Sequence, residues 1–309
     1  MHPIARRQFL AGAALLVAHQ GTIAAEEIPH LTLGIGTYGF KNIAVDSAIE
    51  TIADIGFDSV EIAVFPGYDA EPAKLSPQRR RDLRRILHGT RLHLSGLMEN
   101  LPPSADPVRA RADLDRLERV VELSWDLAPE EPPLVQTVLG PGTWTDKRTL
   151  FRDRLGDWLE VFATAKVVLA IKPHRGGAMS QPADAIWLFD QLGRSPWLRM
   201  VYDYSHYAHR DLSVADTVRT ALPMMAHVVV KDAVKVGDKV EFRLPGVSDF
   251  DYPDLLRTVV AAGYRGDVCC EVSGMVSGQT GYDAVEAART CHRNMTRAFN
   301  QARIRRGGA

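Results

Sequence analysis

The feature of this sequence that most limits its fold is a regular alternation between short β-rich runs and longer amphipathic runs, which occurs eight times. The period-2 runs predict strands at residues 31–35, 59–64, 92–97, 135–139, 167–171, 198–202, 227–230 and 268–272. The 3.6-period runs predict helices at residues 45–55, 77–87, 110–123, 148–163, 182–192, 252–262 and 282–300. Eight strand and helix units in this order favour an α/β fold of the closed (β/α)8 type, the TIM barrel.

An open, doubly wound sheet is the alternative architecture for alternating strands and helices. The glycines of residues 34–39 do not have the spacing of a dinucleotide-binding fingerprint, and the segment does not open directly into a helix. The chain also has no long linker or low-complexity tract, and 309 residues suit one barrel domain. We therefore expect a single barrel over residues 26–309.

The first 25 residues have the pattern of a signal peptide. Arg6 and Arg7 precede Phe9 and Leu10, and an apolar run and a small-residue exit follow. The paired arginines are typical of a twin-arginine signal, which predicts export to the periplasm as a folded protein. A membrane anchor is the alternative, but the apolar run over residues 9–18 is about half of the roughly 20 residues that span a bilayer. We expect cleavage and no stable membrane anchor.

The charge and the cysteine content of the chain limit the kinds of ligand and the disulfide bonds that we expect. The chain has 37 basic and 38 acidic residues, so no overall field attracts nucleic acid, and a small polar ligand fits better. Cys269 and Cys270 are adjacent on a predicted strand, where their side chains point in opposite directions, and with Cys291 they predict no disulfide framework. The oligomeric state is left open, although exposed barrel helices often form dimers.

Polar residues gather where the last four predicted strands end. In a (β/α)8 barrel these ends form the active-site face, so we expect the side chains to meet there. Strand alternation places Lys172 with His174, and His227 with Lys231, on common faces. The candidates from these strands are Lys172, His174, Arg175, Asp203, His206, His227, Lys231 and Glu271. Two further candidates lie outside these strands. Glu61 on the second strand is a candidate for an ion pair or a substrate contact, and Trp144 after the fourth strand is a candidate for stacking on a sugar ring.

Four segments resemble the sugar isomerase and epimerase superfamily of xylose-isomerase-like TIM barrels, which also includes inosose-processing enzymes and apurinic endonucleases. They are LAIKPH at 169–174, VYDYSH at 201–206, VVVKD at 228–232 and GDVCCEV at 266–272. The resemblance implies one divalent metal held by Glu, Asp, His and Glu from strands five to eight. Asp203 and Glu271 match two of these positions, whereas Lys172 and Val229 occupy the other two.

Two hypotheses follow for the cofactor. In the first, His174, Asp203, His227 and Glu271 form a mixed nitrogen and oxygen site for Zn, Mn, Co or Fe. In the second, the site is free of metal, and a protonated Lys172 is its cationic centre. Both keep Asp203 and Glu271 as the acidic part of the site.

The chemistry implied by the resemblance is proton removal next to a carbonyl of a sugar or cyclitol. Glu271 is then the expected base, with Lys172 or His174 as the second acid/base group. The side chains expected to hold the substrate are Arg175, His206, Lys231, Glu61 and Trp144. A keto-sugar lyase or dehydratase and a catalytically degenerate carbohydrate-binding barrel remain as alternatives. An apurinic endonuclease is disfavoured because the chain has no basic stripe and too few ligands for a trinuclear zinc site.

Overall fold

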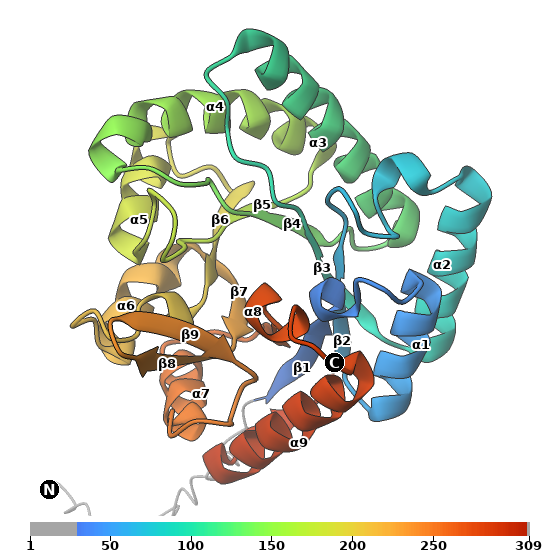
Figure 1. Ribbon diagram of the computed structural model, residues 1–309. Helices are drawn as coiled ribbons and strands as arrows, with labels where there is room; N and C mark the ends of the chain where they lie inside the picture. The colour runs from blue at the N-terminus through green and yellow to red at the C-terminus, as the bar shows by residue number, and fades with distance from the viewer. Residues whose placement is uncertain (1–29, 308–309) are drawn as a thin grey trace, which may run out of the picture.

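Eight parallel strands close into a barrel in the computed structural model, which describes residues 30–307 (Figure 1). The strands are β1 (His30–Gly36), β2 (Ser59–Ala63), β3 (His93–Met98), β4 (Leu134–Thr137), β5 (Leu169–Ile171), β6 (Leu198–Tyr202), β7 (Met225–Val230) and β10 (Asp267–Cys270). The closing pair is β10 with β1, in which Val268 lies opposite Leu33. The predicted (β/α)8 barrel is confirmed, and the open-sheet alternative is wrong.

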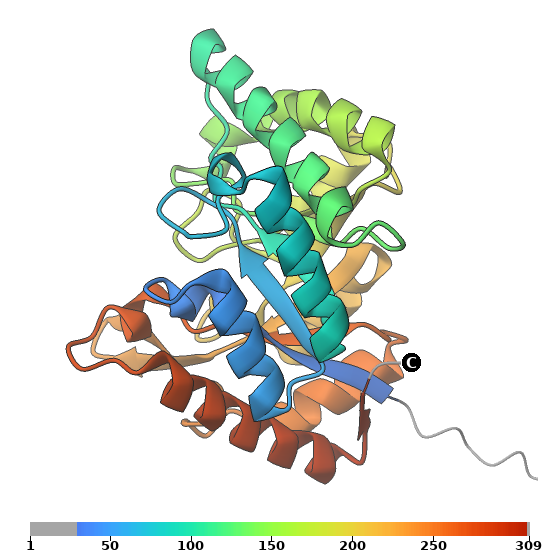
Figure 2. The ribbon, with the colours of Figure 1, turned by 90° about the vertical axis from the view of Figure 1, so that its right-hand side faces the viewer.

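Helices cover the outside of the barrel. They are α1 (Val45–Ile55), α2 (Pro77–Thr90), α3 (Pro107–Leu127), α4 (Trp144–Ala165), α5 (Pro182–Gln191), α6 (Val214–Ala221), α7 (Tyr252–Ala261) and α9 (Ala284–Ala302). Polar caps set several starts: the side chains of Ser76, Asp106 and Asp283 accept backbone N–H bonds at the first turns of α2, α3 and α9. Figure 2 shows α1, α2 and α9 packed along the outside of the strands.

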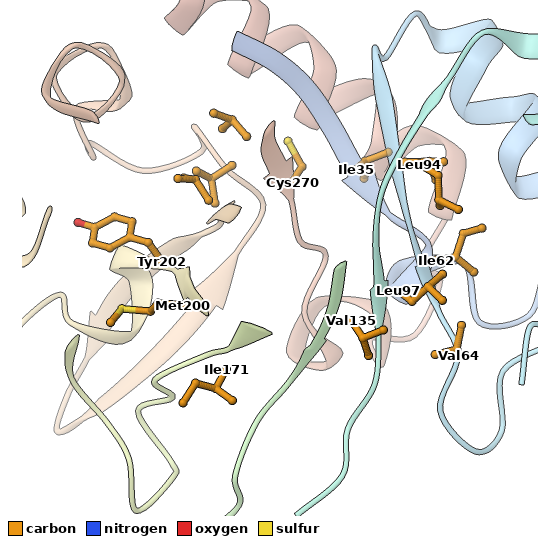
Figure 3. Close-up of a cluster of buried hydrophobic side chains, with 14 of the residues drawn as sticks. Ile35, Ile62, Val64, Leu94, Leu97, Val135, Ile171, Met200, Tyr202 and Cys270 are labelled. Carbon is orange, nitrogen blue, oxygen red and sulfur yellow. The ribbon is translucent and has the colours of Figure 1, made fainter. Parts of the chain in front are cut away.

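The main hydrophobic core lies between the strands and these helices. Figure 3 shows part of it, with Ile35, Ile62, Val135 and Ile171 contributed by four different strands. A second, smaller cluster fills the barrel itself, and its buried members are Ala170, Val201, Val229 and Cys269. Cys269 and Cys270 therefore lie on opposite faces of β10, as predicted, and all three cysteines are buried and free.

Helix α6 was not among the predicted elements, and neither were a hairpin and a short helix after the strand ends. An antiparallel hairpin of β8 (Asp232–Val236) and β9 (Lys239–Arg243) follows β7, and the short helix α8 (Gly274–Ser277) follows β10 (Figure 1). The Asp232 carboxylate fixes the base of the hairpin by accepting hydrogen bonds from Ser248 N at 2.6 Å and from the Tyr252 hydroxyl at 2.6 Å. The backbone N–H of Phe242 on β9 lies 3.4 Å from the Met275 sulfur of α8, so these two elements contact each other.

The remaining short elements are η1 (Thr37–Phe40), η2 (Pro72–Lys74), η3 (Tyr204–His206), η4 (Leu222–Met224) and β11 (Arg305–Arg306), which pairs with the start of β1. Within residues 30–307 no helix is long and apolar enough to cross a membrane. The signal peptide predicted for residues 1–25 lies outside the described residues.

Candidate functional site

Four charged side chains form one layer directly above the apolar cluster that fills the barrel. Lys172, Asp203, Lys231 and Glu271 each follow a member of that cluster by two residues, at the carboxyl ends of β5, β6, β7 and β10. Because side chains two apart on a strand point the same way, all four point into the barrel mouth. We call these four residues the charged cluster.

Each ammonium of the charged cluster contacts both carboxylates. Lys172 Nζ lies 2.6 Å from Glu271 Oε2 and 4.0 Å from Asp203 Oδ2. Lys231 Nζ lies 2.9 Å from Glu271 Oε1 and donates a short hydrogen bond to Asp203 Oδ2. The exposed fraction of these residues is 7% for Glu271 and 3% or less for the other three. The cluster is therefore buried, with two positive and two negative groups that balance.

The opposite charges decide the protonation of the cluster. Burial alone raises the pKa of Glu271, but Lys172 and Lys231 outweigh it and lower that pKa to about 2. The pKa of Asp203 is likewise held well below its usual value, since Lys231 and His206 outweigh burial. Burial lowers the pKa of Lys172, but Glu271 and Asp203 outweigh it and raise that pKa above its usual value. These three groups are therefore charged at neutral pH.

Two neutral histidines border the charged cluster. His206 Nε2 lies 3.2 Å from Lys231 Nζ, and the His174 and His206 rings pack with their centroids 4.1 Å apart. Burial, followed by nearby lysines, lowers the pKa of His174 to about 4 and that of His206 to about 3. His174 Nδ1 accepts a hydrogen bond from Gly176 N at 3.2 Å, which leaves its ring proton on Nε2 as a donor.

A closed barrel with charged residues at the carboxyl ends of its strands also occurs in a known protein family. The family described as xylose isomerase-like TIM barrel matches residues 49–295. The chain belongs to this family.

Solved structures of the family's fold superpose on most of the chain. A D-psicose 3-epimerase with D-tagatose from Clostridium cellulolyticum is 16% identical, with a TM-score of 0.72, and the match covers 88% of this chain and 99% of that one. A xylose isomerase-like TIM barrel protein from Mycobacterium smegmatis in complex with magnesium is also 16% identical, with a TM-score of 0.67 and coverage of 88% and 98%.

A third match is a fusion of a xylose isomerase-like TIM barrel with 4-hydroxyphenylpyruvate dioxygenase. It is 20% identical, with a TM-score of 0.70, and the match covers 88% of this chain but 43% of the fusion. No curated protein sequence matches the chain.

The metal implied by the family resemblance does not fit the residues of this barrel. The ammonium groups of Lys172 and Lys231 lie between the Asp203 and Glu271 carboxylates, where a cation bound by both would be held. Among residues 30–307, no group of three or more His, Cys, Asp or Glu side chains is placed to hold a metal ion. The predicted set of His174, Asp203, His227 and Glu271 is therefore not assembled.

His227 does not join that set because it lies deeper in the barrel than the other three residues. It shares the inward face of β7 with Lys231, as predicted, but it precedes Lys231 by four residues, which is about 13 Å along a strand. There its Nε2 lies 3.5 Å from Glu61 Oε2, and Gln136 donates to the same carboxylate oxygen. Glu61 is 2% exposed, and burial raises its pKa to about 7. Glu61 thus connects His227, deeper in the barrel, to the charged cluster, since the charges of Lys172 and Glu271 also act on the pKa of Glu61.

The other two candidates for substrate contact are bound to the scaffold. The Arg175 guanidinium donates to the backbone carbonyl of Ala208. Trp144 begins α4 and packs edge-on against Trp187 of α5, with ring centroids 5.6 Å apart. The structure does not show either side chain in contact with the charged cluster.

Two aromatic residues near the cluster were missed by the sequence analysis. The Phe242 ring of β9 lies 4.9 Å from Lys231 Nζ and edge-on to His206 at 5.1 Å. Tyr38 follows β1, and its pKa is raised by burial and then by the charge of Glu271. The signal for Phe242 was present, because residues 239–243 alternate in polarity after Gly237 and Asp238, which is typical of a hairpin. No pattern in the sequence marked Tyr38.

The buried His227 should by itself make the fold less stable in acid, an effect that the raised pKa of Glu61 opposes. Burial lowers the pKa of His227 from 6.5 to about 4, so on unfolding below pH 6.5 this ring takes up a proton that the folded state does not hold. The folded state loses about 1.4 kcal/mol of stability per pH unit for each such proton between pH 6.5 and 4. Neither His227 ring nitrogen has a hydrogen-bond partner, so His227→Phe is tolerable and should reduce the slope of unfolding free energy against pH by about this amount. Urea titrations at several pH values measure it.

His88→Phe is the control for this measurement. His88 is exposed on α2, so its replacement should leave the slope unchanged. Equal slopes for wild type and His227→Phe would contradict the assignment of a neutral, buried His227.

Proposed function

We propose that this chain is a sugar isomerase or epimerase-like enzyme that removes a proton next to a carbonyl of a sugar or cyclitol. The observation that carries the proposal is the charged cluster, because it places a carboxylate base and ammonium donors side by side in a buried barrel mouth. The D-psicose 3-epimerase match supports the same class of chemistry through its fold. A neutral cluster suits an uncharged, hydroxyl-rich substrate.

Glu271 is the proposed base. It takes the proton from carbon, and the electron pair moves to the carbonyl oxygen to give an enediolate. Lys172 Nζ is hydrogen-bonded to Glu271 at 2.6 Å, so an enediolate oxygen beside Glu271 lies within reach of the same ammonium. His174, a neutral donor through Nε2, is proposed to donate a hydrogen bond to the enediolate oxygen, while the protonated Glu271 carboxyl returns its proton to carbon and becomes a carboxylate again.

A low pKa weakens Glu271 as a base, and this favours a second candidate, a carbohydrate-binding barrel without catalysis. An enzyme overcomes the weakness only if the ammonium groups stabilise the enediolate as strongly as they stabilise the carboxylate. A lyase or dehydratase shares the first step, since the same carbanion can expel a leaving group instead of regaining its proton.

Solvent exchange separates these candidates. The protein is incubated in D2O with ketoses, aldoses, keto-sugars and ketocyclitols, and each sugar is analysed by mass spectrometry and NMR. An isomerase or epimerase incorporates one deuterium at the carbon next to the carbonyl, and a lyase gives a product that has lost its leaving group. Binding detected by calorimetry without any exchange would reject the enzyme in favour of the carbohydrate-binding barrel.

We further propose export to the periplasm, on the basis of the paired Arg6 and Arg7 and the apolar run after them. The expected result is that the mature protein starts near residue 26 and is found in the periplasmic fraction. Arg6→Lys with Arg7→Lys should retain the precursor in the cytoplasm. Correct export of this variant would contradict a twin-arginine signal.

A further inference from the structure

We propose that Lys231 is the fixed cation of this barrel, in the place of the metal that the family resemblance implies, and that Lys172 is the ammonium that faces the ligand. The site then works without a metal ion. This inference deepens the proposed function, but it depends on the geometry of the charged cluster and is tested without a substrate.

Protein groups surround the Lys231 ammonium on several sides. Its ammonium donates a short hydrogen bond to Asp203 Oδ2, lies 3.2 Å from His206 Nε2 and forms an ion pair with Glu271 Oε1 at 2.9 Å. The Phe242 ring lies over the same ammonium at 4.9 Å. Lys231 therefore joins the ends of β6 and β10, as a shared metal ion does, and its ammonium is held by protein groups from both strands.

Lys172 has fewer close protein partners than Lys231. Its Nζ has one acceptor at hydrogen-bond distance, Glu271 Oε2 at 2.6 Å, while Asp203 Oδ2 is 4.0 Å away. Lys172 is 2% exposed, so its remaining N–H groups are also shielded from solvent. Buried donors without acceptors are costly, and a ligand oxygen would satisfy them. Lys172 is therefore the member of the pair suited to bind a carbonyl or enediolate oxygen.

The two lysines together also supply the charge of a divalent ion. They contribute two positive charges, which neutralise Asp203 and Glu271. A metal would have to lie about 2.0–2.2 Å from the same carboxylate oxygens, inside the space that the ammonium groups fill. Metal binding would therefore require both lysines to move away or lose their protons, against their contacts with the two carboxylates.

Metal titration of the wild-type protein tests this inference directly. After dialysis against a chelator, the protein is titrated with Mn²⁺, Zn²⁺ and Mg²⁺ by calorimetry, and its Tm is measured with and without each metal. We expect no saturable binding and an unchanged Tm. Binding of one equivalent that disappears in Asp203→Asn would overturn the inference.

A gain-of-function variant tests whether removal of the two lysines allows the site to bind a metal. Lys172→Glu with Lys231→Met leaves three carboxylates and no ammonium in the layer, and this set should bind one Mn²⁺ and raise the Tm when Mn²⁺ is added. Lys172→Gln with Lys231→Met is the matched control, which lacks the third carboxylate and should bind Mn²⁺ at least tenfold more weakly. If the first variant does not fold alone, refolding with and without Mn²⁺ is followed by circular dichroism.

Absence of any Mn²⁺ effect on folding or Tm of the first variant would contradict the claim that the lysines keep a metal out. These outcomes are independent of catalysis. Absence of solvent exchange would reject the proposed enzyme but not the assignment of Lys231 as the fixed cation. Stoichiometric metal binding by the wild-type protein would reject that assignment but not the proposed enzyme.

Discussion

Lys231→Met is expected to lower the free energy of unfolding by about 3–5 kcal/mol, because removing one partner of a buried ion pair leaves the other charge uncompensated. Asp203 has no exposed surface, and without Lys231 its remaining ammonium neighbour is Lys172 at 4.0 Å. Methionine has a volume similar to that of lysine, so the loss of unfolding free energy would come mainly from the missing charge and not from altered packing. Equilibrium unfolding in urea measures it.

Two other variants serve as controls for this prediction. Lys235→Met, on the exposed part of β8, should change the unfolding free energy by less than about 0.5 kcal/mol. Lys172→Met should be less damaging than Lys231→Met, since Lys172 makes one close ion pair with the protein and Lys231 makes two. Equal stability of Lys231→Met and wild type would show that Lys231 is not the fixed cation.

Glu271→Gln is expected to reduce solvent exchange at the substrate carbon by about 10²–10⁴-fold, the usual contribution of a general base. The amide keeps the shape of the side chain and can still accept a hydrogen bond from Lys172, but it removes the charge that pairs with Lys172 and Lys231, so the variant should also be less stable and is compared under conditions where circular dichroism shows it folded. The exchange rate is measured by deuterium incorporation from D2O, and sugar affinity by calorimetry.

Glu118→Gln is the control, because Glu118 is exposed on α3 and distant in sequence from the strand ends. It should exchange at the wild-type rate. Undiminished exchange in Glu271→Gln would remove Glu271 from the mechanism and would direct attention to His174 as the base.

The fold could be predicted from periodicity because the strands are buried on both faces and the helices are amphipathic. The main core and the inner cluster of the barrel account for these two patterns. The hairpin β8–β9 was missed because its residues are partly exposed, which weakens the apolar pattern, although the turn at Gly237 and Asp238 was visible.

The charged cluster could be predicted only in part. Strand alternation correctly placed Lys172, Asp203, Lys231 and Glu271 at one end of the barrel. Alternation gives the face of a strand but not the depth, and this explains why His227 was wrongly grouped with residues about 13 Å further along. The pairing of Lys231 with both carboxylates depends on how four strands are staggered, which no single segment of sequence contains.

The most direct test of the whole account is deuterium exchange into the sugar substrate in the presence of excess chelator, with wild type and Glu271→Gln compared side by side. We expect that the wild-type protein exchanges at a rate that the chelator does not change, and that Glu271→Gln loses this exchange. Exchange that stops with the chelator and returns with added metal would contradict it.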